Sequence, residues 1–306
     1  MRKTGFLILL LAWAAVSSAQ MRLLVVNDLG RNGYYEQKPI AELMGKMAEE
    51  QDIEAVLALG DIHHFMGVES IDDPLWMTNY ELIYSHPALQ IPWYPILGNH
   101  EYRGNTQAVL DYSAVSRRWQ MPARYYSKVF EEDGATLRVV FIDTTPLIDK
   151  YHKDSVDYPS VAGQDGNQQL AWMESELREA KEDWVVVVGH HPVYAFTQKS
   201  ESERSDMQKR VGSILRRHRA DMYICGHIHN FQHIRPQGAQ TDYVVNSAGS
   251  LARSHVEKTE GTLFVSGEAG FSILSFTKDE LRLDLVNAEG ETLHSVRRVK
   301  NGDCNP

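Results

Sequence analysis

The chain has 306 residues, a hydrophobic content of 43% and a formal net charge of −10, which together are typical of a globular protein. The acidic balance argues against a nucleic-acid-binding surface, because such surfaces need clustered basic side chains. A small anionic substrate is not excluded, since bound metal ions set the local field of their own site.

The N-terminus has the three parts of a secretory signal peptide. Arg2 and Lys3 precede an apolar run over residues 6–16 and a small-residue cleavage region that ends at Ala19. This pattern predicts a signal peptide over residues 1–19 and a secreted or periplasmic mature chain. A buried or anchoring N-terminal helix is the alternative, but the run is shorter than a membrane span requires. We therefore expect no membrane span in the mature chain.

Strand patterns alternate with helical patterns in the first part of the chain. The apolar runs 23–26, 55–59 and 93–97 predict buried strands, and segments 40–50 and 74–84 have helical spacing. Strands that alternate with helices indicate right-handed crossovers and a largely parallel sheet.

The middle of the chain adds one helix, one pair of strands and one loop. Residues 105–119 are predicted to be helical, and segments 124–129 and 137–143 are predicted to be paired strands. Residues 151–166 are polar and rich in turn formers, so we interpret them as a loop. The loop either closes over a site as a lid or is a passive insertion.

In the last part of the chain, helices again alternate with strands, and short strands follow them. Helices are predicted at 167–181 and 205–218, each followed by a strand, at 184–188 and 221–225. From residue 231 to 299, short strands with Gly-containing turns dominate.

No linker, repeat or low-complexity stretch divides the mature chain, so we expect one domain over residues 20–306. Parallel units lead and antiparallel strands follow. This order predicts an α/β fold in which two sheets pack as a β sandwich flanked by helices, a four-layer α/β/β/α arrangement.

Side chains with metal-binding groups follow most of the predicted strands. The candidate ligands are Asp28, Asp61, His64, Asn99, His190, His227 and His229. Their oxygen and imidazole donors suit iron, zinc or manganese. The carboxyl ends of strands in an α/β sheet are also where such folds place their sites.

The candidate ligands divide into two sets that share one carboxylate. Asp61 is the candidate bridge, because a carboxylate offers two oxygens to two metals. One set then holds Asp28, His64 and His229, and the other holds Asn99, His190 and His227. A hydroxide that bridges two such metals would be ionised near neutral pH and could attack phosphorus in line.

His100 directly follows a candidate ligand, so it is positioned to donate a proton to the leaving oxygen or to hold the phosphate. Asp61 and His100 are therefore the predicted catalytic residues. His227 and His229 flank a single residue, and in an extended segment both would face the same side. Gly226 before them allows the backbone to approach closely.

In their order and amino-acid sequence, these motifs resemble those of the tartrate-resistant or purple acid phosphatases within the calcineurin-like metallophosphoesterases. The resemblance extends from residue 22 to residue 298, and its most specific segments are 60–68, 91–100, 189–193 and 225–230. It implies a two-sheet sandwich, a dinuclear metal site and phosphomonoester hydrolysis. It also implies the same ligand assignment.

The sequence departs from that family at the position of His64. The family's colour comes from a tyrosinate bound to ferric iron at this position, whereas imidazole is neutral and suits divalent iron, zinc or manganese. The identity of the two metals stays open. If His64 only lines the pocket, Tyr34 or Tyr35 is the substitute ligand to consider.

A second departure lies in the loop after His191, where animal members of the family carry another acid–base histidine. This chain has Lys199 there, which either binds the substrate phosphate as a point charge or is a solvated loop lysine. Asn99, His191 and Lys199 are the candidate substrate contacts.

These observations predict an exported, monomeric, dinuclear-metal acid phosphatase that acts on a small phosphorylated substrate. A phosphodiesterase or nucleotide pyrophosphohydrolase on the same metal site is the alternative enzyme. A metal-binding protein without turnover is the alternative from another class. The complete ligand set and His100 argue against it, because a binder needs no proton donor beside its metals.

Overall fold

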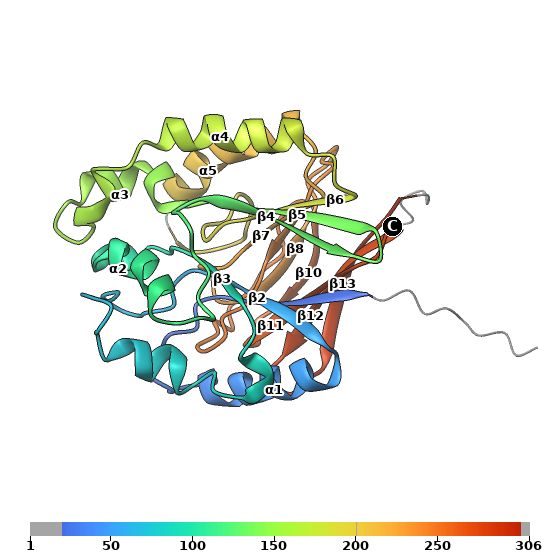
Figure 1. Ribbon diagram of the computed structural model, residues 1–306. Coiled ribbons are helices and arrows are strands. Elements are labelled where there is room, and N and C mark those ends of the chain that lie inside the picture. The colour runs from blue at the N-terminus through green and yellow to red at the C-terminus, as the bar shows by residue number, and fades with distance from the viewer. Residues whose placement is uncertain (1–19, 200, 301–306) are drawn as a thin grey trace, which may run out of the picture.

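Two mixed β-sheets lie face to face, with helices on their outer sides (Figure 1). The computed structural model describes residues 20–199 and 201–300. The predicted signal peptide over residues 1–19 lies outside the described residues. Among the residues that are described, no helix is long and apolar enough to cross a bilayer.

The first sheet joins strands from both ends of the chain. They are β1 (Met21–Val26), β2 (Ile53–Leu59), β3 (Trp93–Ile96), β11 (Gly270–Phe276), β12 (Glu280–Asn287) and β13 (Thr292–Val299). Their order is β13-β12-β11-β1-β2-β3. The strands β1, β2 and β3 are parallel. β11 pairs with β1, β12 with β11 and β13 with β12, each in antiparallel fashion.

The second sheet is built from the middle of the chain. Its strands are β4 (Tyr126–Glu132), β5 (Ala135–Phe141), β6 (Trp184–Val188), β7 (Met222–Cys225), β8 (Phe231–Ile234), β9 (Asp242–Val245) and β10 (Thr262–Ser266). Their order is β10-β8-β9-β7-β6-β5-β4, with a parallel centre from β5 to β9 and antiparallel strands outside it.

The helices complete the predicted four layers. They are α1 (Gln37–Glu50), α2 (Thr106–Asp111), α3 (Asp149–Lys153), α4 (Gly166–Glu179) and α5 (Glu201–Arg217). In Figure 1, α1 lies outside the first sheet, α4 and α5 lie outside the second, and α2 and α3 lie at one end of the sandwich. The α/β sandwich prediction is thus confirmed.

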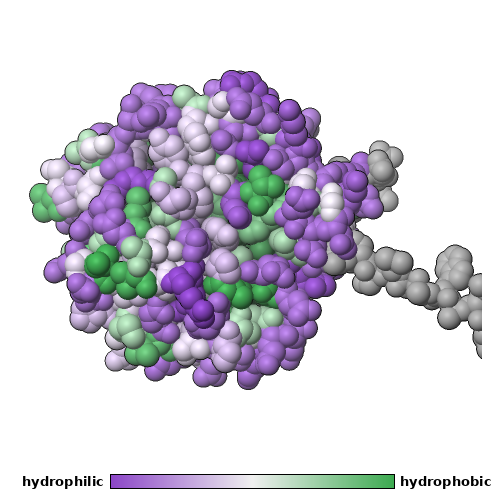
Figure 2. All heavy atoms as spheres, in the orientation of Figure 1, coloured by the Kyte–Doolittle hydropathy of each residue, from purple (hydrophilic) through white to green (hydrophobic). Residues whose placement is uncertain are grey.

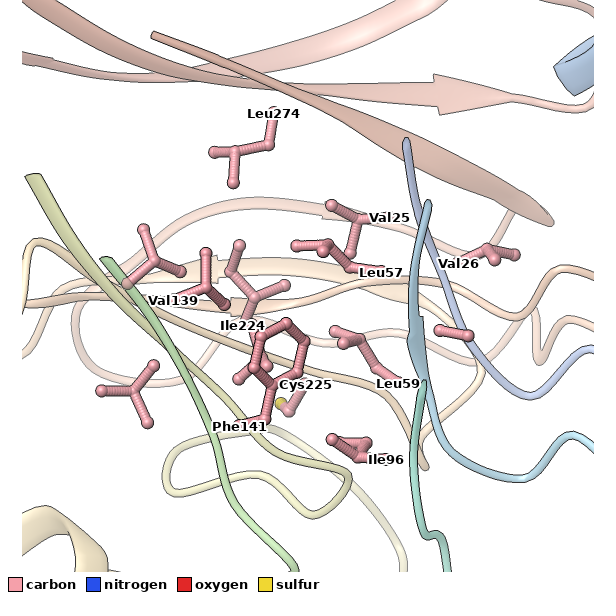
Figure 3. Close-up of a cluster of buried hydrophobic side chains, with 14 of the residues drawn as sticks. Val25, Val26, Leu57, Leu59, Ile96, Val139, Phe141, Ile224, Cys225 and Leu274 are labelled. Atoms are coloured by element: carbon pink, nitrogen blue, oxygen red, sulfur yellow. The ribbon is translucent and has the colours of Figure 1, made fainter. Parts of the chain in front are cut away.

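The core fills the space between the sheets (Figure 3). Val25 and Leu57 from the first sheet meet Val139 and Ile224 from the second, and all four are fully buried. Because these strands are buried on both faces, they read as continuous apolar runs in the sequence rather than as alternating patterns.

Three predicted segments differ in the structure. The helix predicted over 105–119 ends at Asp111 and continues as a short 3-10 turn, Tyr112–Ala114. Segment 74–84 forms only a short helical stretch that includes a π-helical turn, Met77–Glu81. Segment 151–166, predicted as a loop, contains part of α3 and another 3-10 turn, Pro159–Val161.

Aromatic packing explains the first two differences. The ring of Trp76 stacks on Tyr112 with centroids 3.5 Å apart, and the Trp119 indole donates a hydrogen bond to Val109 O at 2.8 Å. These contacts bury large rings between the two segments. Tertiary packing of this kind overrides helix propensity, which is worth only a few tenths of a kcal/mol per residue, to about 1 kcal/mol.

Candidate metal centre

The predicted ligands converge where the parallel strands end. Asp28 follows β1, Asp61 follows β2, Asn99 follows β3, and the histidines follow β2, β6 and β7. All of them are buried, and none exposes more than 5% of its surface. Strands that end at the same edges of two facing sheets therefore bring together residues that are up to two hundred positions apart.

Asp61 lies between the two predicted sets. Its Oδ2 is 3.4 Å from His64 Nε2 and 3.2 Å from His190 Nε2, while its Oδ1 accepts a hydrogen bond from His100 N at 2.9 Å. The ligand atoms of Asp28, His64 and His229 lie within 4.8 Å of one another, and so do those of Asp28, Asp61 and His190. The position of Asp61 suits a carboxylate shared by two metal ions.

Three of the histidines are oriented by backbone carbonyls. In each, Nδ1 lies at hydrogen-bond distance from a carbonyl oxygen: His64 from Gly30 O (3.1 Å), His190 from Leu59 O (2.9 Å) and His229 from Leu251 O (2.6 Å). A carbonyl can only accept, so each ring donates from Nδ1 and turns Nε2 to the centre, where a metal could bind it. Histidine ligands of metals are commonly held in this way.

Several atoms that could bind a metal at the centre lack a hydrogen-bond partner in the part of the chain that the structure describes. They are Asp28 Oδ1, His64 Nε2, Asn99 Oδ1 and His190 Nε2, all buried. An unsatisfied buried polar group costs about 1–3 kcal/mol. Metal ions would satisfy all four at once, so the residues present fit a metal centre.

The backbone at the ligands is in a conformation that few residues adopt. Asp28, Asp61, His227 and His229 have φ of 50°, 52°, 69° and 65°, in the left-handed region. Such strain persists where the surrounding structure imposes it, often at functional sites. A Cβ added to Gly226 would lie 2.6 Å from Asp28 Oδ2, so the backbone approaches as closely as the sequence suggested.

One geometric expectation is corrected. The sequence placed His227 and His229 on an extended segment, but β7 ends at Cys225, before both of them. Instead, both take left-handed conformations in the turn that follows. The alternation rule for strands does not apply to such a turn.

The carboxylates are held in their ionised form, which metal binding requires. Burial would raise the pKa of Asp61, but the neighbouring His190 and His100 hold it well below its usual value. Burial would likewise raise the pKa of Asp28, but the neighbouring His229 lowers it below its usual value.

His100 reaches the centre from its solvent-facing side. Its Nδ1 is 2.7 Å from Phe65 O, which leaves Nε2 3.8 Å from Asp61 Oδ2, and its side chain is 15% exposed. Burial lowers the pKa of His100 to about 4, while the charge of Asp61 acts in the other direction. A bound phosphate would add a further negative charge that favours the protonated ring.

The candidate substrate contacts differ in their access to the centre. The Lys199 ammonium donates to His227 O and is thus close to the ligands. His191 is fully buried, with Nδ1 2.8 Å from Thr144 Oγ1 and Nε2 2.8 Å from Tyr151 Oη. Both ring nitrogens of His191 therefore already have protein partners. The substrate contacts stay predictions.

Tyr34 and Tyr35, the alternative ligands to His64, are exposed beside the buried ligand cluster and are not part of it. They are 71% and 60% exposed, whereas His64 is 5% exposed and points at Asp61. The structure thus places His64, and neither tyrosine, among the predicted ligands.

Glu101 is a supporting residue that the sequence reasoning left without a role. Its buried carboxylate accepts backbone N–H groups from Asp61 (2.9 Å), Ile62 (2.8 Å), His63 (3.0 Å) and Gly98 (2.7 Å). It thereby ties the loop after β2 to the loop after β3. An acidic residue next to a predicted catalytic residue, His100, and two positions after a candidate ligand, Asn99, was the available signal.

Glu203 on α5 is a second residue that sequence reasoning missed. Its Oε2 lies 3.3 Å from His227 Nε2, and its Oε1 accepts from Tyr151 Oη at 2.9 Å and pairs with Lys150. Burial would raise the pKa of Glu203, but His227 holds it well below its usual value. An ionised carboxylate only accepts, so His227 donates from Nε2 and leaves Nδ1 for a metal.

We expect Glu203→Gln to weaken metal binding by about 10- to 100-fold, the usual effect of losing such a supporting partner. The amide cannot accept as strongly from His227 and loses the pairing with Lys150. Competition titration of metal-free protein with Zn²⁺ against a chelator measures the affinity. Glu201→Gln is the matched control, because Glu201 is exposed on the same helix. Equal affinities in the two variants would remove Glu203 from the metal centre.

Comparisons with known proteins agree with this geometry. The sequence profile of the calcineurin-like phosphoesterases matches residues 21–231. Purple acid phosphatase 4 of Arabidopsis thaliana is 33% identical over 281 residues, which cover 89% of this chain and 81% of that protein. Tartrate-resistant acid phosphatase type 5 of Oryctolagus cuniculus is 28% identical over 311 residues, which cover 95% of each chain.

Solved structures with the same fold include proteins of different kinds. GAP50, described as the anchor in the inner membrane complex of Plasmodium, has a TM-score of 0.77 at 22% identity and covers 92% of this chain and 90% of its own. Purple acid phosphatase PPD1 of yellow lupin has a TM-score of 0.67 at 17% identity, with coverages of 92% and 54%. At these identities the likeness shows the fold alone, and one fold supports several functions.

Proposed function

Because the chain belongs to the calcineurin-like phosphoesterase family and is a metal-dependent phosphoester hydrolase, we propose that it is an exported acid phosphatase that cleaves phosphomonoesters at a two-metal centre. The observation that carries the proposal is the central position of Asp61 between two sets of buried candidate ligands, among which His64 Nε2, Asn99 Oδ1 and His190 Nε2 have no hydrogen-bond partner in the described part of the chain. The acid phosphatases among its relatives support the choice of reaction.

The chain's own residues would divide the work between metal binding, substrate binding and proton transfer. Two bound metal ions would supply an ionised water and neutralise charge on the phosphoryl oxygens. Asp61 would hold both ions, and the other ligands would complete one or the other. His100, with Nε2 facing the centre, would donate a proton to the leaving oxygen. Lys199 and Asn99 would contact the phosphate.

The identity of the two metal ions depends on His64. Since His64 is a neutral ligand, a pair of divalent ions among iron, zinc and manganese is proposed.

Export rests on the signal-like residues 1–19. Sequencing the N-terminus of protein recovered from the expressing cell tests it: a start near Gln20 supports export, and a start at Met1 contradicts it.

The choice between monoester and diester is tested with 4-nitrophenyl phosphate and bis(4-nitrophenyl) phosphate on metal-loaded protein. We expect kcat/KM for the monoester to exceed that for the diester by about tenfold or more, since the doubly charged phosphate gains more from two cations. A chelator should abolish both rates and added divalent metal should restore them.

The outcomes separate the candidate functions. A preference for the diester would favour the phosphodiesterase reading and overturn the proposal. Absence of hydrolysis with two metals bound would favour the binding protein without turnover. The Asp61→Asn variant, purified identically, measures the rate contributed by contaminating phosphatases.

A further inference from the structure

Exposed aromatic side chains gather beside the metal centre. Tyr34, Tyr35 and Phe65 are 71%, 60% and 63% exposed, although most of the surface in Figure 2 is hydrophilic with scattered apolar patches. Together with Arg31, Asn32 and His64 they line a cavity of about 350 Å³. Because His64 is a predicted ligand, this cavity opens directly onto the place where a phosphate would bind. We call the three rings the aromatic rim.

Arg31 connects the aromatic rim to the centre. Its guanidinium lies over the Phe65 ring, 4.8 Å from the ring centroid, and the residue is only 9% exposed. Its Nε is buried and makes no hydrogen bond within the described part of the chain. Arg31 also lies within the fields of Asp28 and Asp61. A buried cation with a free donor, beside a metal centre, suits a phosphate oxygen.

We propose that the cavity is a subsite for the leaving group of the substrate, and that this group carries an aromatic ring. The phosphate would lie between the metals and Arg31, and the ring would lie against the aromatic rim. Flat rings stack well on tyrosine and phenylalanine. This inference rests on the proposed phosphatase function and adds the substrate class, an aryl phosphate.

The short distances favour a ring that is joined directly to the bridging oxygen. The Phe65 ring centroid is 6.0 Å from that of His64 and 5.9 Å from that of His100. The rim therefore begins one ring away from the groups that would hold and protonate the phosphoester. In a nucleoside 5′-phosphate a sugar separates phosphate and base, which would carry the base past these side chains. The proposal accordingly commits to aryl phosphates.

The test compares substrates within each variant. We measure kcat/KM for phenyl phosphate, glycerol 2-phosphate and AMP with metal-loaded wild type and with the double variant Tyr34→Ala/Tyr35→Ala. We expect the ratio of phenyl phosphate to glycerol 2-phosphate to fall about tenfold, the size of effect that a lost ring contact produces. Phe65→Leu, which keeps an apolar side chain but removes the ring, should lower the same ratio.

Val299→Ala is the control for a change at an exposed apolar residue. Val299 is 55% exposed and pairs with Glu280 at the start of β12, at the end of the first sheet opposite to the metal centre. Its substrate ratios should equal those of wild type.

Binding without turnover gives a second readout. Phenylphosphonate and methylphosphonate are stable analogues that differ by the ring. Wild type should bind phenylphosphonate about tenfold more tightly, and the double variant should lose this preference.

Each contrary result has a distinct meaning. Equal changes for phenyl phosphate and glycerol 2-phosphate, or no change for either, would overturn the subsite. A selective loss for AMP alone would overturn the commitment to aryl phosphates. If wild type hydrolyses no monoester, the proposed function fails by itself. The phosphonate pair then decides the subsite, and equal affinities would overturn it.

Discussion

Asp61→Asn should abolish hydrolysis of phosphomonoesters, with a loss of about a thousandfold or more, because in the proposed centre this one substitution would remove a charged ligand from both metal ions. Asparagine has nearly the same shape, so the effect would come from charge and coordination. Without the carboxylate, the two cations would repel one another with no negative charge between them. The Nε2 atoms of His64 and His190 lie only 3.4 and 3.2 Å from Asp61 Oδ2, the oxygen that the substitution would replace. Steady-state rates and elemental analysis of the same sample measure both consequences.

The control for Asp61→Asn is Asp279→Asn, an equivalent change at an exposed turn between β11 and β12. It should retain wild-type rate and metal content. Thermal melts in the presence of chelator compare the folds of the two variants without the contribution of bound metal. If Asp61→Asn keeps two metals and more than about a tenth of the rate, Asp61 does not bridge them.

His100→Ala should retain both metals and lose about a hundred- to ten-thousandfold in rate on esters with poor leaving groups, the usual contribution of a general acid. Alkyl phosphates need a proton on the departing oxygen, whereas 4-nitrophenyl phosphate needs it much less. The loss should therefore be far smaller for 4-nitrophenyl phosphate. Plotting log kcat against leaving-group pKa measures the difference as a steeper slope in the variant.

The alternative roles of His100 make different predictions. Its Nε2 lies 3.8 Å from Asp61 Oδ2, and the Asp61, His64 and His100 donor atoms are also close enough to hold a metal. Loss of metal in His100→Ala would make it a ligand. Equal losses on good and poor leaving groups would make it a residue that positions the phosphate.

The sequence predicted the fold, and it placed the candidate ligands after strands, where local pattern determines the structure. Apolar runs such as 55–59 and 184–188 form strands because they are buried on both faces, and each is followed directly by a candidate ligand. Parallel strands of one sheet end at a common edge, so topology accounts for the convergence of Asp28, Asp61 and Asn99 after β1, β2 and β3 of the first sheet. His190 follows β6 of the second sheet, and it meets Asp61 because the two sheets lie face to face with these strand ends on the same side.

The residues that were missed act through contacts that the sequence does not display. Glu203 is thirteen positions after His190 on a helix whose pattern indicates only an amphipathic face, yet its carboxylate meets His227. Arg31 looks like an ordinary loop cation, and only packing against Phe65 shows that it is buried. Both are polar groups placed by tertiary structure, for which periodicity gives no signal.

The helices that were predicted too long have the same explanation. Segment 105–119 has helical spacing because its apolar residues are buried, but they are buried against Trp76 and its neighbours rather than along one helix face. Spacing reports which residues are buried and leaves open what they pack against.

The most direct test of the whole account is a titration of metal-free protein with Mn²⁺ or Zn²⁺ while the hydrolysis of 4-nitrophenyl phosphate is measured. If Asp61 joins two ligand sets into one centre, activity should rise to a plateau at two equivalents of metal per chain. A plateau at one equivalent, or binding of two equivalents without hydrolysis, would contradict a two-metal phosphatase.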